Sequence, residues 1–294
     1  MVTATTEEYI VRRHEWLIEK VLFISAAMAI LVIALITVFV VAEGMPLFQN
    51  YSLWKFLSGL EWDPNGYVFG IFPMIIGSFY VTLGALILGV PVAVACAVFL
   101  AEYAPAWMTR ILRPAIELLA GIPSVIFGFW GLVVVVDLIR DHAPGRGLSI
   151  VAASIVLAVM ILPTVINISE DAIRAVPRSF KEGSLALGAT HWQTIRSVIL
   201  PAARSGILAA IVLGMGRAIG ETMAVIMVAG NSPKLALSIW EPVRTLTANV
   251  ALEMGYAAGD HYRALFATGI VLFIIIMLLN SLIGILPKKA GDER

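Results

Sequence analysis

Long apolar runs, separated by short charged segments, dominate the chain. A helix of about 20 apolar residues covers the roughly 30 Å of hydrocarbon in a bilayer, and backbone amides in lipid must find their partners within the protein. Each run of that length is therefore expected to form a transmembrane helix. Six runs qualify, at about Val21–Ala42, Phe69–Tyr103, Leu112–Leu138, Leu148–Ile168, Ile199–Ala229 and Leu265–Leu286. The pattern predicts an all-α, polytopic membrane protein with six transmembrane helices.

Proline and glycine interrupt two of the runs. The second run is longer than one straight span needs, and Pro73 and Pro91 indicate a bend or an interfacial first turn. The third run is broken by Gly121-Ile-Pro-Ser124. The first run is longer than the apolar core of a signal peptide and ends in Val-Val-Ala-Glu-Gly, so we expect a retained helix rather than a signal peptide.

The domain organisation follows from these runs. We expect an N-terminal segment with the first helix and an external loop (1–68), a membrane core of five helices (69–288) and a short tail (289–294). Most Lys and Arg residues between the runs lie on the side that holds both termini. Because such residues concentrate in cytoplasmic loops, both termini are expected in the cytoplasm.

Composition supports a membrane protein and excludes several other classes. Hydrophobic residues make up 60% of the chain, charged residues only 14%, and the mean hydropathy is +0.93. Acidic and basic residues balance at 20 each, so the charge gives no reason to expect a nucleic-acid ligand. Cys96 has no partner for a disulfide, and the 4 histidines lack metal-ligand spacing. We therefore expect no metal and no cofactor in this chain.

The segment between the fourth and fifth runs, Ser169–Ser197, is too polar to cross the membrane and too long for a tight turn. We expect it to form a cytoplasmic structure. Pro177 can begin a helix and Gly188 can end one. The pattern predicts a short amphipathic helix at about 177–188, with three side chains at helical spacing along one stripe: Phe180, Ser184 and Leu187.

The same segment resembles a known signature. Glu182-Gly183-Ser184, three residues, Gly188, nine residues and then Val198-Ile-Leu200-Pro201 is similar to the EAA motif of ABC importer permeases. The chain departs from that motif at Gly183, Ser184 and Val198, but the spacing is intact. The resemblance implies that this segment is a coupling helix that docks into a groove of the ATPase subunit. The residues implied in coupling are Glu182, Gly183, Ser184, Gly188, Leu200 and Pro201.

A charged pair lies inside the fifth run. A charged side chain near the middle of a bilayer costs at least about 2.5–3.5 kcal/mol and normally faces a polar interior. Arg217 and Glu221 are four residues apart, which on a helix places both side chains on one face, within pairing distance. The planar guanidinium can hold two oxygens of an oxyanion, Glu221 would weaken that binding enough for release, and Thr222 adds a hydroxyl. We expect these three residues to line the path of an oxyanion; the alternative is a buried ion pair that only fixes helix packing.

Gly216 and Gly220 form a G-x-x-x-G step beside Arg217. Such a step lets a neighbouring helix backbone approach closely. The neighbour could be another helix of this chain or a helix of a partner subunit, and both alternatives bring Arg217 close to a second helix.

The fifth run also carries a more specific family resemblance. Gly216-Arg-Ala-Ile-Gly-Glu-Thr-Met-Ala224 resembles the signature of the phosphate-specific (Pst) permeases of ABC importers. Phe69–Ser78, Phe99–Pro105 and Gly121–Gly128 resemble the C-type subunit of that family more than the A-type. Together the resemblance covers about Phe69 to Leu286.

This resemblance implies a type I ABC importer permease fold in the bacterial cytoplasmic (inner) membrane, with inorganic phosphate as the substrate. It implies three partners, namely a sister permease of the A-type, a dimeric B-type ATPase and a periplasmic phosphate-binding protein. ATP and Mg²⁺ would be bound by the ATPase, and no residue of this chain would be catalytic.

Other functions fit the sequence less well. No G-x-x-x-x-G-K-[ST] motif occurs, so the chain is not itself the ATPase. A permease for sulfate, molybdate or another oxyanion is the nearest alternative, since a guanidinium recognises charge more readily than element. An ion-coupled secondary transporter would also suit a buried charge but would not need the coupling segment. A membrane enzyme finds no support, because Glu102, Asp141 and Glu170 form no acid–base or metal pattern.

Overall fold

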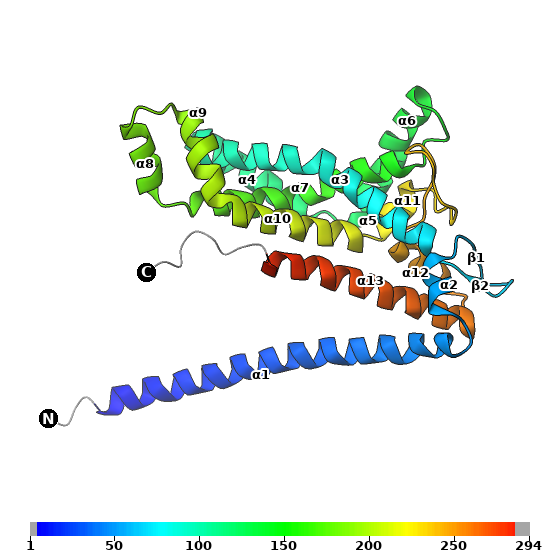
Figure 1. Cartoon of the computed structure of the whole chain (residues 1–294). Coiled ribbons are helices and arrows are strands. Elements are labelled where there is room, and N and C mark those ends of the chain that lie inside the picture. Colours follow the sequence, from blue (N-terminus) through cyan, green and yellow to red (C-terminus); the bar gives the residue numbers. More distant parts are fainter. Residues whose placement is uncertain (1–4, 286–294) are drawn as a thin grey trace.

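A bundle of long helices forms the body of the protein (Figure 1). The computed structural model describes the backbone of residues 5–285 and the side chains of residues 16–281, so the tail expected at 289–294 lies outside the described residues. Five long helices and one bent pair of helices confirm the predicted all-α fold with six spans. Five helices are long and apolar enough to cross a bilayer: α1 (Thr5–Gly44), α3 (Phe72–Val98), α7 (Ile150–Arg174), α10 (Leu200–Gly220) and α13 (Asp260–Ile285). The bent pair of α4 (Ala106–Gly121) and the helices over Ser124–His142 makes a sixth span when it is counted as one.

Shorter elements gather at the two ends of the bundle (Figure 1). One end, here called the hairpin end, carries a two-stranded antiparallel ladder in which Trp62 pairs with Phe69 and Asp63 with Val68. The opposite end, the α8 end, carries α8 (Arg178–Ala186) and α9 (His191–Thr194). The remaining elements are η1 (Met45–Gln49), α2 (Leu53–Ser58), β1 (Trp62–Asp63), β2 (Val68–Phe69), η2 (Phe99–Tyr103), α5 (Ser124–Trp130), η3 (Gly131–Val135), α6 (Val136–His142), η4 (Ile195–Ile199), α11 (Met223–Val228) and α12 (Leu246–Glu253).

The centre of the bundle is formed by α3, α7 and α10. Small residues let these helices approach closely, since a Cβ added to Gly84 of α3 would lie 2.2 Å from the Ser154 hydroxyl of α7. Around this contact, large apolar side chains of α7 such as Leu157 and Ile161 are fully buried. α7 is therefore the central helix, and α3 and α10 are positioned by their contacts with it.

The break predicted in the third run is confirmed. α4 and the helices that follow it are bent by 94° at Ile122-Pro123. Ile122 has extended backbone angles (φ −69°, ψ 128°), as expected for a residue that precedes proline. Pro123 then precedes the first turn of α5, where the missing N–H is tolerated. The other predicted proline effect is also observed, since Pro73 lies in the first turn of α3.

Three π-helical turns lie within the helical segments, a feature that the periodicity of the sequence does not predict. They are η2 at the end of α3, η3 between α5 and α6, and η4 just before α10. A π-turn contains one more residue than the corresponding α-turn, so it rotates all later side chains relative to earlier ones. The face of α10 is therefore set by η4 as well as by its own residues.

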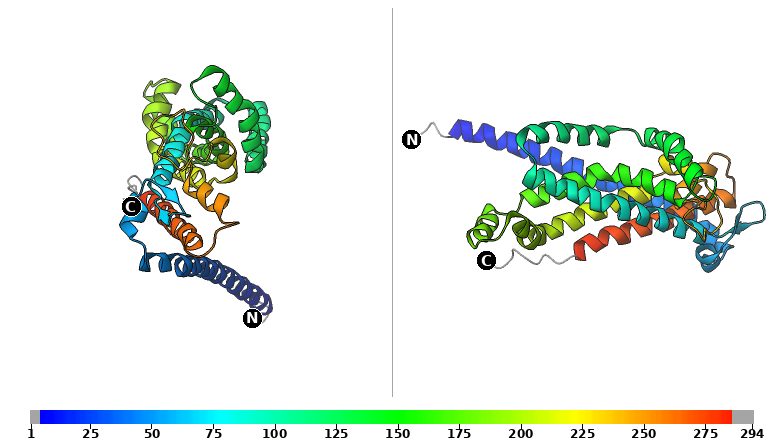
Figure 2. Two further views of the ribbon diagram at one scale, coloured as in Figure 1. Left: turned by 90° about the vertical axis from the view of Figure 1, so that its right-hand side faces the viewer. Right: turned by 90° about the horizontal axis from the view of Figure 1, so that it is seen from above.

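α1 packs on α13 at its hairpin end and diverges from the bundle toward the N-terminus (Figures 1 and 2). Phe39 of α1 meets Phe266 of α13 with ring centroids 5.6 Å apart. A Cβ at Gly44 would lie 2.9 Å from the backbone nitrogen of Ala267, so the two helices touch closely there. None of the apolar span of α1 is buried within the chain, as expected for a helix that contacts lipid or another subunit.

A buried polar network holds the hairpin end together. The Glu253 carboxylate accepts hydrogen bonds from the indole N–H of Trp62 (2.8 Å) and from Arg244 (2.5 Å), and lies 2.8 Å from the His261 ring. Arg244 also donates to the backbone oxygen of Asn231 over 2.9 Å. One carboxylate thus joins the hairpin, α12, α13 and the loop between α11 and α12.

We predict that Gly84→Leu destabilises the fold, because the new side chain would force α3 away from Ser154 of α7. Overpacking of this kind costs about 1–3 kcal/mol. The melting temperature of the detergent-solubilised protein should fall. Gly255→Leu is the control, because a Cβ there would meet nothing within 4 Å. Equal melting temperatures for the two variants would contradict the role given to the α3–α7 contact.

Candidate functional site

Arg217 lies on α10 and contacts α7. Its Nη1 donates a hydrogen bond of 3.2 Å to the hydroxyl oxygen of Thr164, and its side chain is half-buried. Thr164 lies near the middle of α7, about 21 Å from Ile150 and about 15 Å from Arg174 at the helical rise of roughly 1.5 Å per residue. The contact therefore holds a permanently charged guanidinium near the middle of the bundle's long axis.

The predicted ion pair between Arg217 and Glu221 is wrong. α10 ends at Gly220, and Glu221 has extended backbone angles (φ −70°, ψ 131°), so the two residues do not share a helix face. The Glu221 carboxylate instead accepts a 3.2 Å hydrogen bond from the backbone N–H of Ala224, in the first turn of α11. The spacing argument fails because the fifth run is not one continuous helix.

The break between α10 and α11 is held by side chains from both sides of it. Thr247 of α12 donates to the backbone oxygen of Glu221 over 2.9 Å, and the Thr222 hydroxyl donates to the backbone oxygen of Gly220 over 3.3 Å. Non-helical backbone at membrane depth is tolerated where it is buried in protein or lines a polar cavity. The break follows Arg217 by one turn, so irregular backbone and a half-buried charge lie together in the same span.

The G-x-x-x-G step does not pack against this chain. A Cβ added to Gly216 or Gly220 would meet nothing within 4 Å in the described part of the chain. By contrast, Gly206 and Gly214 face α7, where a Cβ would lie 2.4 Å and 2.7 Å from side-chain atoms of that helix. Gly206 and Gly214 therefore pack against α7 of this chain, whereas Gly216 and Gly220, beside Arg217, face away from the chain's own helices.

α8 occupies the position predicted for a coupling helix, with slightly different bounds. The prediction was 177–188, whereas the helix ends at Ala186 because Gly188 adopts a left-handed φ of +85°. No residue of α8 is buried, and Phe180 is 51% exposed. Leu187, immediately after the helix, is 90% exposed. Exposed apolar side chains of this kind are typical of a surface that binds another protein.

The predicted stripe placed Ser184 on the same surface as Phe180 and Leu187. In the structure, Ser184 instead faces α9. Its hydroxyl lies 3.0 Å from the hydroxyl of Thr194, which is fully buried at the end of α9. α9 is a helical turn that the sequence reading missed, and its start is stabilised by a capping box between Thr190 and Gln193. The chain then passes through η4 into α10, where Leu200-Pro201 forms the first turn. The two halves of the EAA-like motif are thus joined through the Ser184–Thr194 contact.

Several residues that complete the site were not identified from the sequence. Thr164 lies 53 residues before Arg217, and Thr247 lies 26 residues after Glu221. Neither threonine carries a signal of its own, because a threonine hydroxyl can also bond to its own helix backbone. Only the antiparallel packing of α7 and α10, and the position of α12, bring these hydroxyls to the site.

Comparison with known families identifies the class of protein. Residues 89–291 match the family described as "Binding-protein-dependent transport system inner membrane component". A probable ABC transporter permease protein YqgH of Bacillus subtilis is 42% identical, covering 90% of this chain and 89% of that protein. The phosphate transport system permease protein PstC of Xylella fastidiosa is 36% identical, covering 92% and 91%, and that of Haemophilus influenzae is 34% identical, covering 92% and 93%.

Solved structures show the same fold at low sequence identity. A chain of a bacterial alginate ABC transporter, solved with a periplasmic protein that carries an alginate pentasaccharide, aligns with a TM-score of 0.66 at 15% identity, covering 95% of this chain and 97% of that one. A chain of the MetNI methionine ABC transporter aligns with a TM-score of 0.55 at 20% identity, covering 78% and 100%. With its apolar helices, these matches make the chain a multi-pass inner-membrane permease. The chain belongs to the family of binding-protein-dependent transport system inner membrane components.

Proposed function

We propose that this chain is the permease subunit of an ABC importer that carries inorganic phosphate across the cytoplasmic membrane. The observation that carries the proposal is the Arg217 guanidinium held near mid-span by Thr164. The relatives named as phosphate transport permeases support phosphate as the substrate. The chain itself is a transport permease and not an enzyme, and the ATP is hydrolysed by a separate subunit.

The loss of the expected ion pair strengthens this assignment. Glu221 uses its carboxylate on the backbone of α11, and Arg217 forms no ion pair with any described side chain. A single hydrogen bond to Thr164 orients the guanidinium and leaves its other N–H donors for an anion. Bidentate N–H donors match the oxygens of phosphate, and the charge persists at any physiological pH. Thr222 lies on the break one turn further along, where its hydroxyl proton is donated to the backbone oxygen of Gly220, so an anion would have to replace that bond to use it.

The α8 end supplies the connection to the motor. We propose that α8 docks on a dimeric ATPase of the B-type through the exposed Phe180 and Leu187, while Glu182 lines the cavity on the α3 side of the helix. Movement of α8 would reach α10 through Ser184 and Thr194, and α10 carries Arg217. A rigid chain of contacts of this kind is what an external ATPase needs in order to move a membrane site.

Topology and further partners complete the proposal. The α8 end and both termini would lie in the cytoplasm, and the hairpin end would face a periplasmic phosphate-binding protein. Gly216 and Gly220 would face the sister permease of the A-type or the pore between the two permeases. Residues 1–68 would add one span to the permease core at 69–288. ATP and Mg²⁺ would bind only to the ATPase; among the described residues, no three His, Cys, Asp or Glu side chains are grouped to hold a metal.

We predict that Arg217→Ala lowers phosphate uptake by about thirtyfold or more, since losing a buried charged partner costs about 2 kcal/mol or more. Arg217→Lys should recover only part of the uptake, because an ammonium lacks the planar fork. Uptake would be measured with the complete transporter in liposomes, alongside the recovery of assembled complex. Arg204→Ala, an exposed position on the same helix, is the control. Normal phosphate uptake by Arg217→Ala would show that this residue serves only in packing. Loss of sulfate uptake with unchanged phosphate uptake would show that the transporter carries sulfate rather than phosphate.

We predict that Gly188→Ala partly uncouples ATP hydrolysis from uptake, whereas Gly183→Ala does not. Neither new Cβ meets an atom within 4 Å, so crowding cannot explain a difference. Gly188 has a φ of +85°, where an L side chain costs about 1–2 kcal/mol, and Gly183 lies in the helix interior, where alanine stabilises by about 0.5–1 kcal/mol. The readout is phosphate transported per ATP hydrolysed. The same ratio in both variants would mean that the turn after α8 does not set its position.

A further inference from the structure

A single carboxylate at the end of α3 meets side chains from both short helices of the α8 end. Glu102 lies in η2, and its side chain is only 10% exposed. Its Oε2 accepts a hydrogen bond of 2.5 Å from Nζ of Lys181 in α8 and lies 3.4 Å from Nε2 of His191 in α9. The ring of His191 also packs edge-on against Tyr103, with centroids 4.9 Å apart. α3 is thus joined to α8 and α9 at one point.

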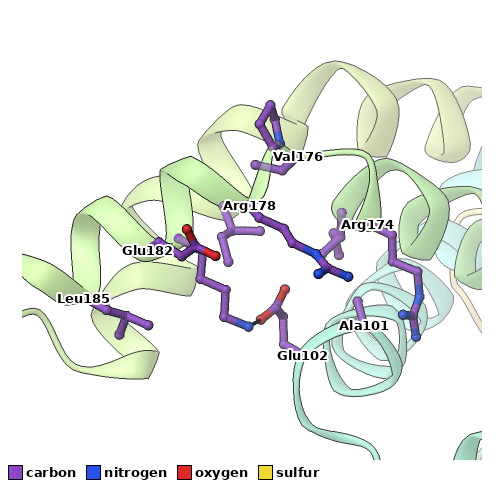
Figure 3. Close-up of a pocket in the computed structure, with 11 residues that line it drawn as sticks. Ala101, Glu102, Arg174, Val176, Arg178, Glu182 and Leu185 are labelled. Atoms are coloured by element: carbon purple, nitrogen blue, oxygen red, sulfur yellow. Dashed lines mark hydrogen bonds and ion pairs between the residues drawn. The ribbon is translucent and has the colours of Figure 1, made fainter.

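The Lys181–Glu102 pair joins α8 to the end of α3 beside a cavity that lies between them. A cavity of about 530 Å³ lies beside the pair, and its lining includes Ala101, Glu102, Arg178, Glu182 and Leu185. Figure 3 shows Glu102 on one wall of this cavity and Arg178 and Glu182 on the facing wall. Because α8 has no buried residue, apolar packing does not fix its position over this space. The polar link from Lys181 to Glu102 crosses this space and joins α8 to the end of α3, in addition to the Ser184–Thr194 contact with α9.

The burial of Glu102 makes the link stronger than an ordinary surface pair. Fully exposed ion pairs contribute little, because both charges keep their water and are screened by salt. Glu102 has lost most of its water, so removing Lys181 would leave a poorly hydrated carboxylate without its permanently placed cation. The pair should therefore form whenever α8 occupies its place.

The two attachments of α8 lead to the two helices that form the proposed phosphate site. Ser184 and Thr194 connect α8 to α10, which carries Arg217. Lys181 and Glu102 connect α8 to α3, which packs on α7, the helix that carries Thr164. We propose that Glu102 is a positioning residue for coupling: its pair with Lys181 makes α3 and α7 move with α8, together with α10. This inference rests on the proposed function.

The test uses the complete transporter in liposomes and measures phosphate transported per ATP hydrolysed. Glu102→Gln and Lys181→Met should each lower this ratio by about twofold to thirtyfold, the range expected for residues that transmit coupling. ATP hydrolysis itself should persist, because α8 would still dock. Arg204→Met is the control, because it removes an exposed charge of α10 that forms no ion pair among the described residues. An unchanged ratio in both Glu102→Gln and Lys181→Met would overturn the proposal.

Reversing the charges separates pairing from a general structural role. The double variant with Glu102→Lys and Lys181→Glu should recover most of the ratio that either single change loses. Failure to recover, with the complex assembled in normal yield, would also overturn the proposal.

A chemical link provides a second test if a charge variant does not assemble. Glu102→Cys and Lys181→Cys, in a background that replaces the single cysteine with Cys96→Ser, can be joined by a bifunctional thiol reagent. The joined protein should couple normally and the unjoined protein poorly; equal coupling would contradict the inference. Stimulation of ATP hydrolysis by the loaded binding protein, measured in parallel, reports coupling whichever anion is carried. Absence of phosphate uptake by the unaltered complex would count against the proposed function alone.

Discussion

The backbone between α10 and α11 has to be hydrogen-bonded by the protein itself, because lipid offers no partners. Glu221 meets this requirement twice, since its carboxylate accepts from the N–H of Ala224 and its backbone oxygen accepts from Thr247. Because α10 ends at Gly220, this carboxylate lies at the start of α11 and forms no ion pair with Arg217. The guanidinium therefore contacts only the Thr164 hydroxyl among the described side chains and remains a positive charge inside the bundle. The chemistry of the site follows from how the helix is interrupted.

α10 joins this charge to the α8 end of the molecule. Its glycines at 206 and 214 sit against α7 so closely that a methyl group would not fit, which couples the two helices over most of their length. Its first turn follows directly from η4 and α9, where Thr194 contacts Ser184 of α8. The same helix therefore carries Arg217 near its last turn and connects to α8 at its first turn.

The sequence predicted the spans well and the site only in part. Runs of about 20 apolar residues have few alternatives to a helix in lipid, and Pro123 marks the one sharp bend, so these features could be read directly. The end of α10 at Gly220 could not be predicted from the sequence, because no proline marks it and the four-residue spacing from Arg217 to Glu221 is compatible with a helix. The contacts of three further residues could not be predicted, because their partners lie far away along the chain. These residues are Thr164, Thr247 and Glu102. The EAA-like motif identified α8 but not the carboxylate that positions it.

The π-turn η4 sets how far α10 is rotated about its own axis relative to α9, which precedes it. Its five residues, Ile195–Ile199, contain one residue more than a regular helix would place there. One residue corresponds to a rotation of about 100° about the helix axis. Removing a single residue from this turn would let the helix run on without interruption, with every hydrogen bond intact. The side chains before the turn, which contact α8, and the Arg217 guanidinium after it would then point in directions that differ by about 100° from their native relation.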